Sequence, residues 1–185
     1  MKERMPRPWV VLGTEALHDC KVFRVRRALV RSPLSGDAHP FFSIEADPWV
    51  NVVPVTADGH VVMVRQYRHG SREVTLEIPG GIVDPGEDPA VAAARELIEE
   101  TGYRAAEVRP LGSLNPNPAL FGNRVHTFLA EGVTKVGEIV NGPLEETVVE
   151  LVPAREIRER LRRGEIDHAL VVAALQRWLL DVETR

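Results

Sequence analysis

The sequence predicts an α/β or α+β sandwich. Short strand-like runs alternate with helical segments, and the connections between them are short. The composition, 44% hydrophobic and 27% charged, is that of a globular protein able to bury a sizeable core. A length of 185 residues suits one domain, or one domain with a small appendage.

The first part of the chain is predicted to form short strands. Strand-like runs occupy residues 9–12, 22–30 and 41–44, and the second of them mixes apolar residues with arginines. That mixture is typical of a sheet with one face in water. A turn at 32–37 separates the last two runs. We therefore expect a small antiparallel sheet at the N-terminus.

Two buried strands and a hairpin turn come next. Residues 49–55 and 61–64 are rich in valine, and an Asp-Gly pair lies in the turn 57–60 between them. A short strand at 76–78 then leads into the loop 79–87, which contains three glycines.

The best-defined helix follows this loop. Asp88 suits the N-cap, and Pro89 suits the first helical position. Residues 90–101 are rich in alanine, leucine and glutamate, which favour a helix. Gly102 stands where a left-handed C-cap is needed.

The remaining elements continue the alternation. Three further strands are predicted at residues 108–114, 124–129 and 147–151. Two helices are predicted at 153–163 and about 167–182, the second with an apolar stripe through Leu170, Ala174 and Trp178.

Charge and cysteine content exclude several classes of protein. A formal charge of −4 argues against a surface that coats nucleic acid. The single cysteine, Cys20, rules out an intrachain disulfide and fits a reducing compartment. The sequence contains neither an apolar run long enough to span a membrane nor an apolar segment after its basic start. A cytoplasmic location is therefore expected.

Three glutamates on the best-defined helix point to metal chemistry. Glu96, Glu99 and Glu100 stand at i, i+3 and i+4 and therefore share one helix face. A divalent cation such as Mg²⁺ would relieve their repulsion, and Gly80 and Gly81 allow backbone groups to come close. The alternative is an ordinary solvated helix face, in which Arg95 and Glu99 form an i,i+4 ion pair.

The loop and the helix together resemble the Nudix box. From Gly81 the chain runs through Glu87 to Arg95-Glu96-Leu97-x-Glu99-Glu100-x-Gly102, with the spacing of that motif at every defined position. The resemblance implies a Nudix fold, with a mixed sheet between helices, and metal-dependent hydrolysis of a diphosphate bond. It also implies that Mg²⁺, or Mn²⁺ in its place, is held by Glu96, Glu99, Glu100 and the Gly80 carbonyl. Structural support is expected from Gly81, Glu87, Arg95 and Gly102.

Two further features resemble the ADP-ribose and nucleoside diphosphate sugar pyrophosphatase branch. The first is Arg68 at the end of Val-Arg-Gln-Tyr-Arg, followed by Glu77 in Leu-Glu-Ile-Pro-Gly-Gly. In that branch the matching arginine contacts the diphosphate and the matching glutamate lies beside the substrate. An arginine fork suits phosphate oxygens, although a solvated arginine at a strand end is the simpler interpretation of Arg68 alone.

The second feature is Pro118, which lies 16 residues after Gly102 as that branch requires, but the stretch then departs from the pattern. Asn123 occupies the place of an acidic residue that is a favoured general base in relatives, and an amide cannot accept a proton from water. Replacement candidates are Glu145 and Glu146, with Glu99 next, although the first two also fit a plain acidic loop. Asn117 and Asn123 are instead expected to bind a sugar or base of the substrate.

The N-terminal strands also resemble that branch, whose members form homodimers through an N-terminal sheet. We therefore expect residues 1–47 to be a dimerisation element and residues 48–185 to be the Nudix hydrolase domain. Trp49, Phe41 and Phe42 are candidates for stacking on a nucleobase, although aromatic residues at strand spacing are more often core.

The expected reaction splits ADP-ribose or a nucleotide sugar into a nucleoside monophosphate and a sugar phosphate. Two alternatives remain open. One is a Nudix hydrolase for another nucleotide, such as a nucleoside triphosphate or a dinucleoside polyphosphate. The other is a Nudix domain that senses metabolites without catalysis, although the complete box argues against it. The expected partner is a small nucleotide, with no role for nucleic acid or membrane.

Overall fold

The computed structural model describes residues 5–184, which form two compact units. One unit contains the chain up to Asp47 together with the loop Asn115–Asn123. The other contains Pro48–Leu114 and the chain from Arg124 onward. The loop therefore groups with the N-terminal strands, whereas the sequence interpretation placed it in the region 48–185.

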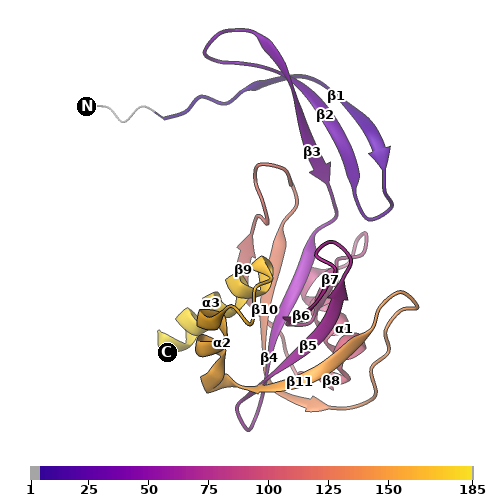
Figure 1. Cartoon of the computed structure of the whole chain (residues 1–185), viewed down its shortest axis with the longest axis vertical. Coiled ribbons are helices and arrows are strands. Elements are labelled where there is room, and N and C mark those ends of the chain that lie inside the picture. Colours follow the sequence, from indigo (N-terminus) through magenta and orange to yellow (C-terminus); the bar gives the residue numbers. More distant parts are fainter. Residues whose placement is uncertain (1–4, 185) are drawn as a thin grey trace. The chain divides into compact units, whose positions relative to one another are not determined.

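The first unit is a three-stranded antiparallel sheet (Figure 1). Its strands are β1 (Val10–Asp19), β2 (Arg24–Arg31) and β3 (Ala38–Glu45), in that spatial order. β1 is longer than the predicted run 9–12, because pairing with β2 extends it through polar residues that carry little strand signal of their own. The loop joins the sheet through a bridge between Ile44 and Phe121.

The second unit contains a mixed sheet of eight strands. These are β4 (Trp49–Thr56), β5 (His60–Arg68), β6 (Glu73–Glu77), β7 (Gly80–Ile82), β8 (Tyr103–Arg104), β9 (Arg109–Leu114), β10 (Val125–Lys135) and β11 (Thr147–Pro153). The main path runs β11-β5-β4-β10-β8, with β10 parallel to β4 and the other neighbours antiparallel.

The centre of this sheet divides just beyond the hairpin that joins β4 to β5. The two strands pair only at Val55 and Val61. Beyond that point β5 pairs with β6, and β4 pairs with β7. The glycine-containing loop after β6 therefore enters the middle of the sheet, where the strands separate.

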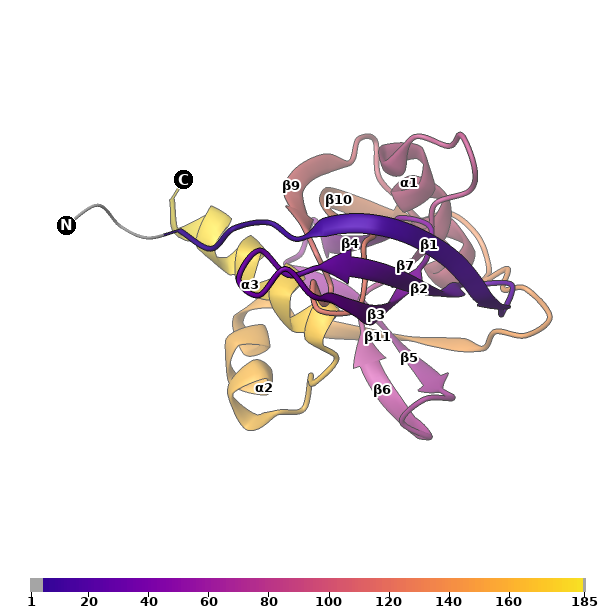
Figure 2. The same ribbon diagram turned by 90° about the horizontal axis from the view of Figure 1, so that it is seen from above.

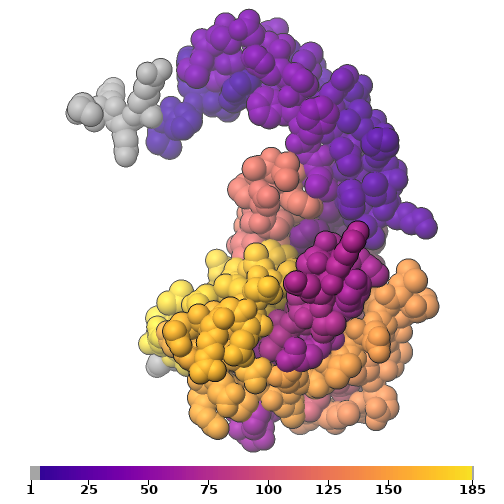
Figure 3. Space-filling view, viewed as in Figure 1, coloured from indigo at the N-terminus to yellow at the C-terminus, as the bar shows by residue number. Residues whose placement is uncertain are grey.

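Helices cover both faces of the sheet, which confirms the predicted fold class. They are α1 (Pro89–Thr101), a 3₁₀ turn (Ala154–Glu156), α2 (Ile157–Arg163) and α3 (Ala169–Glu183). Val52 of β4 packs into the core with α1, whereas Val53 points to the opposite core with α2 and α3. Figure 2 shows α1 on one side of the sheet and α3 on the other, and Figure 3 shows α2 and α3, in yellow tones, covering their side.

The ends of α1 are as the sequence predicts. Asp88 Oδ1 accepts a hydrogen bond from Ala90 N at 2.8 Å, and Pro89 is the first helical residue. Gly102 has φ of 71°, and its N–H bonds the Ile98 carbonyl. These caps fix where the glutamate face begins and ends. Among the described helices, none is long and apolar enough to cross a membrane.

Candidate active site

The three glutamates of α1 differ in their exposure. Glu100 is only 4% exposed, and its Oε2 accepts a hydrogen bond from Gly80 N at 3.0 Å. The carboxylate of Glu96 lies against Gly81, and its side chain is 12% exposed. The Glu99 side chain is 43% exposed. Glu96 and Glu100 therefore face the glycine loop, and Glu99 lies at the edge.

Burial makes the two inner carboxylates reluctant to ionise. It is the main cause that raises the pKa of Glu100 to about 8; the nearby charges of Glu96 and Glu145 add to this, while the Gly80 N–H opposes it. Burial also raises the pKa of Glu96. A cation between these carboxylates would remove the repulsion and replace the lost hydration.

Arg95 ties the loop to the helix. Its Nε and Nη2 donate to the two carboxylate oxygens of Glu87 at 3.0 and 2.9 Å. Its Nη1 donates to Glu96 at 2.8 Å and to Glu99 at 3.2 Å, and its Nη2 also reaches the Ile82 carbonyl. The hydrogen bond from Arg95 lowers the pKa of Glu87. One guanidinium thus orients three carboxylates and the loop backbone.

A second arginine lies where β5 ends. Arg68 Nε and Nη2 each donate to Glu77 at 2.7 Å, and the Thr75 hydroxyl donates to the same carboxylate at 2.6 Å. Burial raises the pKa of Glu77, which is 2% exposed, but the hydrogen bonds from Arg68 and Thr75 outweigh it and the net pKa is lowered. Glu77 is therefore an ionised, buried anchor for Arg68.

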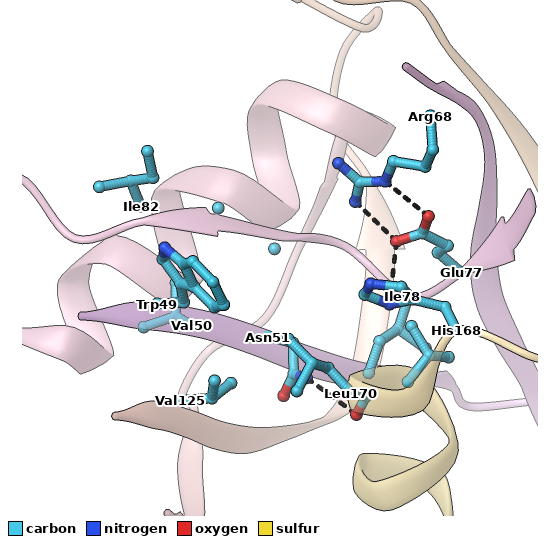
Figure 4. Close-up of a pocket in the computed structure, with 13 residues that line it drawn as sticks. Trp49, Val50, Asn51, Arg68, Glu77, Ile78, Ile82, Val125, His168 and Leu170 are labelled. Atoms are coloured by element: carbon cyan, nitrogen blue, oxygen red, sulfur yellow. Dashed lines mark hydrogen bonds and ion pairs between the residues drawn. The ribbon is translucent and has the colours of Figure 1, made fainter. Parts of the chain in front are cut away.

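A cavity of about 270 Å³ lies between this pair and the start of α3. Figure 4 shows Trp49 and Ile82 towards one end and Arg68, Glu77 and His168 towards the other, with Asn51 between them. Gly80 and Gly81 also line it, so the cavity adjoins the loop that faces Glu96 and Glu100. The remaining walls are apolar side chains of β4, β10, α3 and the segment after β6: Val50, Ile78, Val125, Leu170 and Val171.

Comparisons with known proteins bear on this geometry. The family model described as the NUDIX domain matches residues 47–175. An ADP-ribose pyrophosphatase from Mycobacterium tuberculosis is 33% identical over 167 residues, which cover 89% of this chain and 80% of that protein. The chain belongs to the Nudix family. It is therefore a Nudix hydrolase, as its motif predicts.

A further related sequence and a similar solved structure extend this comparison. A CMP-5'-(N-acetyl-N-hydroxy-3-aminopropyl)phosphonate hydrolase from Streptomyces rubellomurinus is 34% identical over 159 residues, which cover 84% of this chain and 75% of that protein. A crystal structure described as an ADP compounds hydrolase matches with a TM-score of 0.86, at 22% identity and over 98% of both chains. The second likeness confirms the Nudix fold.

The donor set of the Nudix helix fits a hard divalent cation. Glu96 and Glu100 offer two crowded, buried carboxylates beside the Gly80 backbone. Within residues 5–184, no three carboxylate, imidazole or thiol groups already converge as ligands. Mg²⁺ is commonly held by one or two carboxylates, with waters and substrate phosphates completing its shell, so two are sufficient.

The two candidate bases lie on the loop before β11. Glu145 and Glu146 line a second depression of about 450 Å³ together with Arg68 and His69. The charge of Glu145 raises the pKa values of Glu96, Glu100 and Arg68. Glu145 therefore interacts electrostatically with the inner carboxylates and the arginine, which makes it a suitable candidate base.

Two predicted substrate residues lie in the first unit. Asn123 is 7% exposed, and its Nδ2 donates to the Asp47 carbonyl at 3.0 Å. Asn117 Oδ1 accepts from Ala119 N at 3.2 Å and so stabilises its own turn. These bonds give both amides a structural role, and their role in substrate binding stays a prediction.

Two polar residues of the cavity, Asn51 and His168, were not predicted as site residues from the sequence. Asn51 is a buried amide in the valine-rich strand β4. A polar residue in an otherwise apolar strand is visible in the sequence and could have marked Asn51 as a candidate site residue. His168 immediately precedes α3, and its Nδ1 lies 3.5 Å from Glu77 Oε2. The link between His168 and Glu77 joins segments about ninety residues apart, so local sequence could not reveal it.

Replacing Gly81 with alanine is expected to reduce activity about a hundredfold while the protein stays folded. A Cβ at this position would overlap the carboxylate of Glu96, and that flexible side chain must move aside. Steady-state kinetics and a thermal melt test this. Gly70→Ala, where a Cβ meets open space, is the matched control and should retain activity. Equal activity in the two variants would show that the position of Glu96 is unimportant.

Proposed function

We propose that the enzyme hydrolyses the diphosphate bond of ADP-ribose or a nucleoside diphosphate sugar, with Mg²⁺ as the preferred ion and Mn²⁺ as a substitute. The observation that carries the proposal is the pair of buried carboxylates, Glu96 and Glu100, facing a glycine loop that also borders the cavity beside Arg68. Similarity to an ADP-ribose pyrophosphatase supports this substrate class.

In this proposal each group has a separate task. Glu96, Glu100 and the Gly80 carbonyl hold the ion, which neutralises charge on the diphosphate when bound. Glu99 stays with Arg95 at the edge of the site. Arg68 bonds Glu77 through Nε and Nη2, which leaves Nη1 to donate to a phosphate oxygen. Glu145 accepts the proton of the attacking water, and the products are a nucleoside monophosphate and a sugar phosphate.

A substrate panel tests the proposal. ADP-ribose, ADP-glucose, GDP-mannose, a CMP-linked phosphonate, a dinucleoside polyphosphate and the nucleoside triphosphates are incubated with Mg²⁺, and the products are separated by chromatography. We expect turnover of ADP-ribose or a nucleotide sugar, lost with a chelator and restored by Mg²⁺. The CMP compound is included because of the Streptomyces relative.

The other outcomes of the panel are equally informative. Turnover of triphosphates or polyphosphates alone would assign the enzyme to a different substrate class. Binding of nucleotides without turnover of any compound would favour a sensor. Turnover that is insensitive to the chelator would refute the metal assignment.

We also propose that the first unit forms a homodimer. Phe41 and Phe42 are adjacent on β3, so they point to opposite faces, and they are 53% and 54% exposed. Several other large apolar residues of this unit are exposed as well: Trp9, Val10, Val11, Leu12, Leu17 and Leu29. Apolar surface of this extent in a folded protein marks an interface.

Light scattering coupled to size exclusion should therefore give twice the chain mass of 20.6 kDa. Phe42→Ser should shift the protein towards monomer, because it removes an exposed aromatic ring from the proposed interface. Val182→Ser, which alters an exposed residue of α3, is the control and should leave the dimer intact. A monomeric parent protein at micromolar concentration would contradict the proposal.

A further inference from the structure

Asn51 presents an unpaired hydrogen-bond acceptor at the cavity. It stands third in Trp-Val-Asn-Val-Val of β4 and is 6% exposed. Its Nδ2 lies 3.4 Å from the Leu170 carbonyl and donates to it, whereas its Oδ1 has no hydrogen-bond partner among the described residues. A buried polar atom without a hydrogen-bond partner costs free energy. An asparagine at this position of a valine-rich strand is therefore best explained by a function.

The orientation of this amide follows from its one partner. If the amide were flipped, Oδ1 would face the Leu170 carbonyl, and two acceptors would repel each other. Oδ1 is therefore the atom that points away from α3 (Figure 4). As a carbonyl-type oxygen it can be satisfied only by a donor, such as a hydroxyl or an amino group.

His168 lies at the same cavity with a similar deficit. Its Nδ1 is 3.5 Å from Glu77 Oε2, close enough for an electrostatic contact, but no aligned hydrogen bond to this atom is found in residues 5–184. Glu77 already accepts from Arg68 and Thr75. The cavity thus contains two polar groups whose hydrogen bonding is incomplete.

The size and position of the cavity limit what can enter. Its volume of about 270 Å³ lies below the range of roughly 300–1,000 Å³ that holds a drug-sized ligand, so it suits one ring rather than a whole nucleotide. Arg68, Gly80 and Gly81 line it, so a ring held here is attached directly to the phosphate that the site binds. In a nucleotide sugar that ring is either the sugar of the sugar phosphate half or the ribose of the nucleoside. The nucleoside ribose would bring its nucleobase with it, and a cavity suited to one ring leaves no room for both.

We infer that this cavity is the subsite for the sugar of the sugar phosphate half, and that Asn51 selects it by accepting a hydrogen bond from a sugar hydroxyl. The inference rests on the proposed function and adds to it a residue that determines specificity. Trp49 supplies an apolar wall for the C–H face of the ring, and His168 is a second group available to the hydroxyls.

The test measures product binding, which requires no turnover. Dissociation constants of ribose 5-phosphate, AMP and inorganic phosphate are determined by ligand-observed NMR in one Mg²⁺ buffer. The parent protein should bind ribose 5-phosphate more tightly than inorganic phosphate. Asn51→Val should raise the dissociation constant of ribose 5-phosphate about five- to tenfold, which is the effect of one lost hydrogen bond. It should change the dissociation constants of AMP and inorganic phosphate less than about twofold.

A thermal melt separates recognition from a structural role. Asn51→Val removes an unpaired buried acceptor and adds a good strand former, so its Tm should be equal to or above that of the parent. If valine overpacks the site, Asn51→Ala carries the same expectation for binding. Weaker binding of all three ligands, together with a lower Tm, would show that Asn51 has a structural role and would overturn the inference.

Three other results would also overturn it. The first is that both variants bind ribose 5-phosphate as the parent does. The second is that the variants lose affinity for AMP and not for ribose 5-phosphate, and the third is that the parent binds inorganic phosphate more tightly than ribose 5-phosphate. Because binding is read without catalysis, failure here is distinguishable from failure of the substrate panel. A protein that hydrolyses ADP-ribose but shows no role for Asn51 would keep the proposed function and lose the subsite.

Discussion

Replacing Glu100 with glutamine is expected to lower activity about a thousandfold and, without metal at alkaline pH, to make the protein more stable. The loss of activity follows because the neutral amide offers no negative charge to the ion, and removal of one well-placed electrostatic group alone costs about 10²–10³ in rate. The gain in stability follows from the burial of the carboxylate, which is 4% exposed.

The direction in which stability changes with pH follows from the pKa of Glu100, which is about 8 in the folded protein. In the unfolded chain a glutamate has a pKa of about 4.3, so the folded state holds this proton more tightly. The stability contributed by the group is complete below about pH 4 and is lost as pH rises through 8. At pH 8.5 ionised Glu100 should destabilise the metal-free protein by on the order of 2–5 kcal/mol.

Thermal melts with chelator at pH 5 and pH 8.5 check this expectation. The Tm of Glu100→Gln should exceed that of the parent at pH 8.5 and approach it at pH 5. Mg²⁺ should raise the Tm of the parent but not of the variant. Glu107→Gln, at an exposed position after α1, is the matched control and should follow the parent throughout. Near-normal turnover by Glu100→Gln would show that the ion is held elsewhere.

Glu145→Gln is expected to lower kcat about 10²- to 10⁴-fold with little change in KM, the usual contribution of a general base. Glutamine keeps the size of the side chain but cannot accept the proton of water. Glu146→Gln, one residue further along the same exposed loop, is the matched control and should stay within about threefold of the parent. Single-turnover kinetics at saturating substrate measure the chemical step directly.

The size of the loss in each variant identifies which residue acts. If Glu146→Gln carries the large loss instead, the assignment within the pair is reversed. If both variants remain active, Glu99 becomes the candidate, because it stands next to Glu100 and is partly exposed.

The elements that carry the proposed metal site were predictable because their signals are local. Asp88, Pro89 and Gly102 define α1 by capping rules that operate within one turn. The glutamate spacing then places the carboxylates on one face without knowledge of the rest of the fold. The 57–60 hairpin turn was predictable for the same reason, because its Asp-Gly pair suffices.

Other elements depend on partners distant in sequence. β7 contains two glycines, which have low strand propensity, and it forms only because β4 is beside it. The helix predicted at 153–163 begins as a 3₁₀ turn, and α2 proper starts at Ile157. The cavity could not be anticipated either, since it brings Asn51, Glu77 and His168 together from three separate segments.

The loop that carries Glu145 is fastened at both ends to the last turn of α1. Val140 N bonds the Glu99 carbonyl at 2.8 Å, and the Thr147 hydroxyl donates to the Glu100 carbonyl at 2.8 Å. Asn141 Nδ2 in turn donates to Thr147 Oγ1 at 2.9 Å. The residues between these attachments form a short closed loop on α1, the helix of the proposed metal site, so loop closure costs little entropy. Insertions between the two attachments should therefore be tolerated as long as Glu145 keeps its place, because the carboxylate cluster on α1 keeps its geometry.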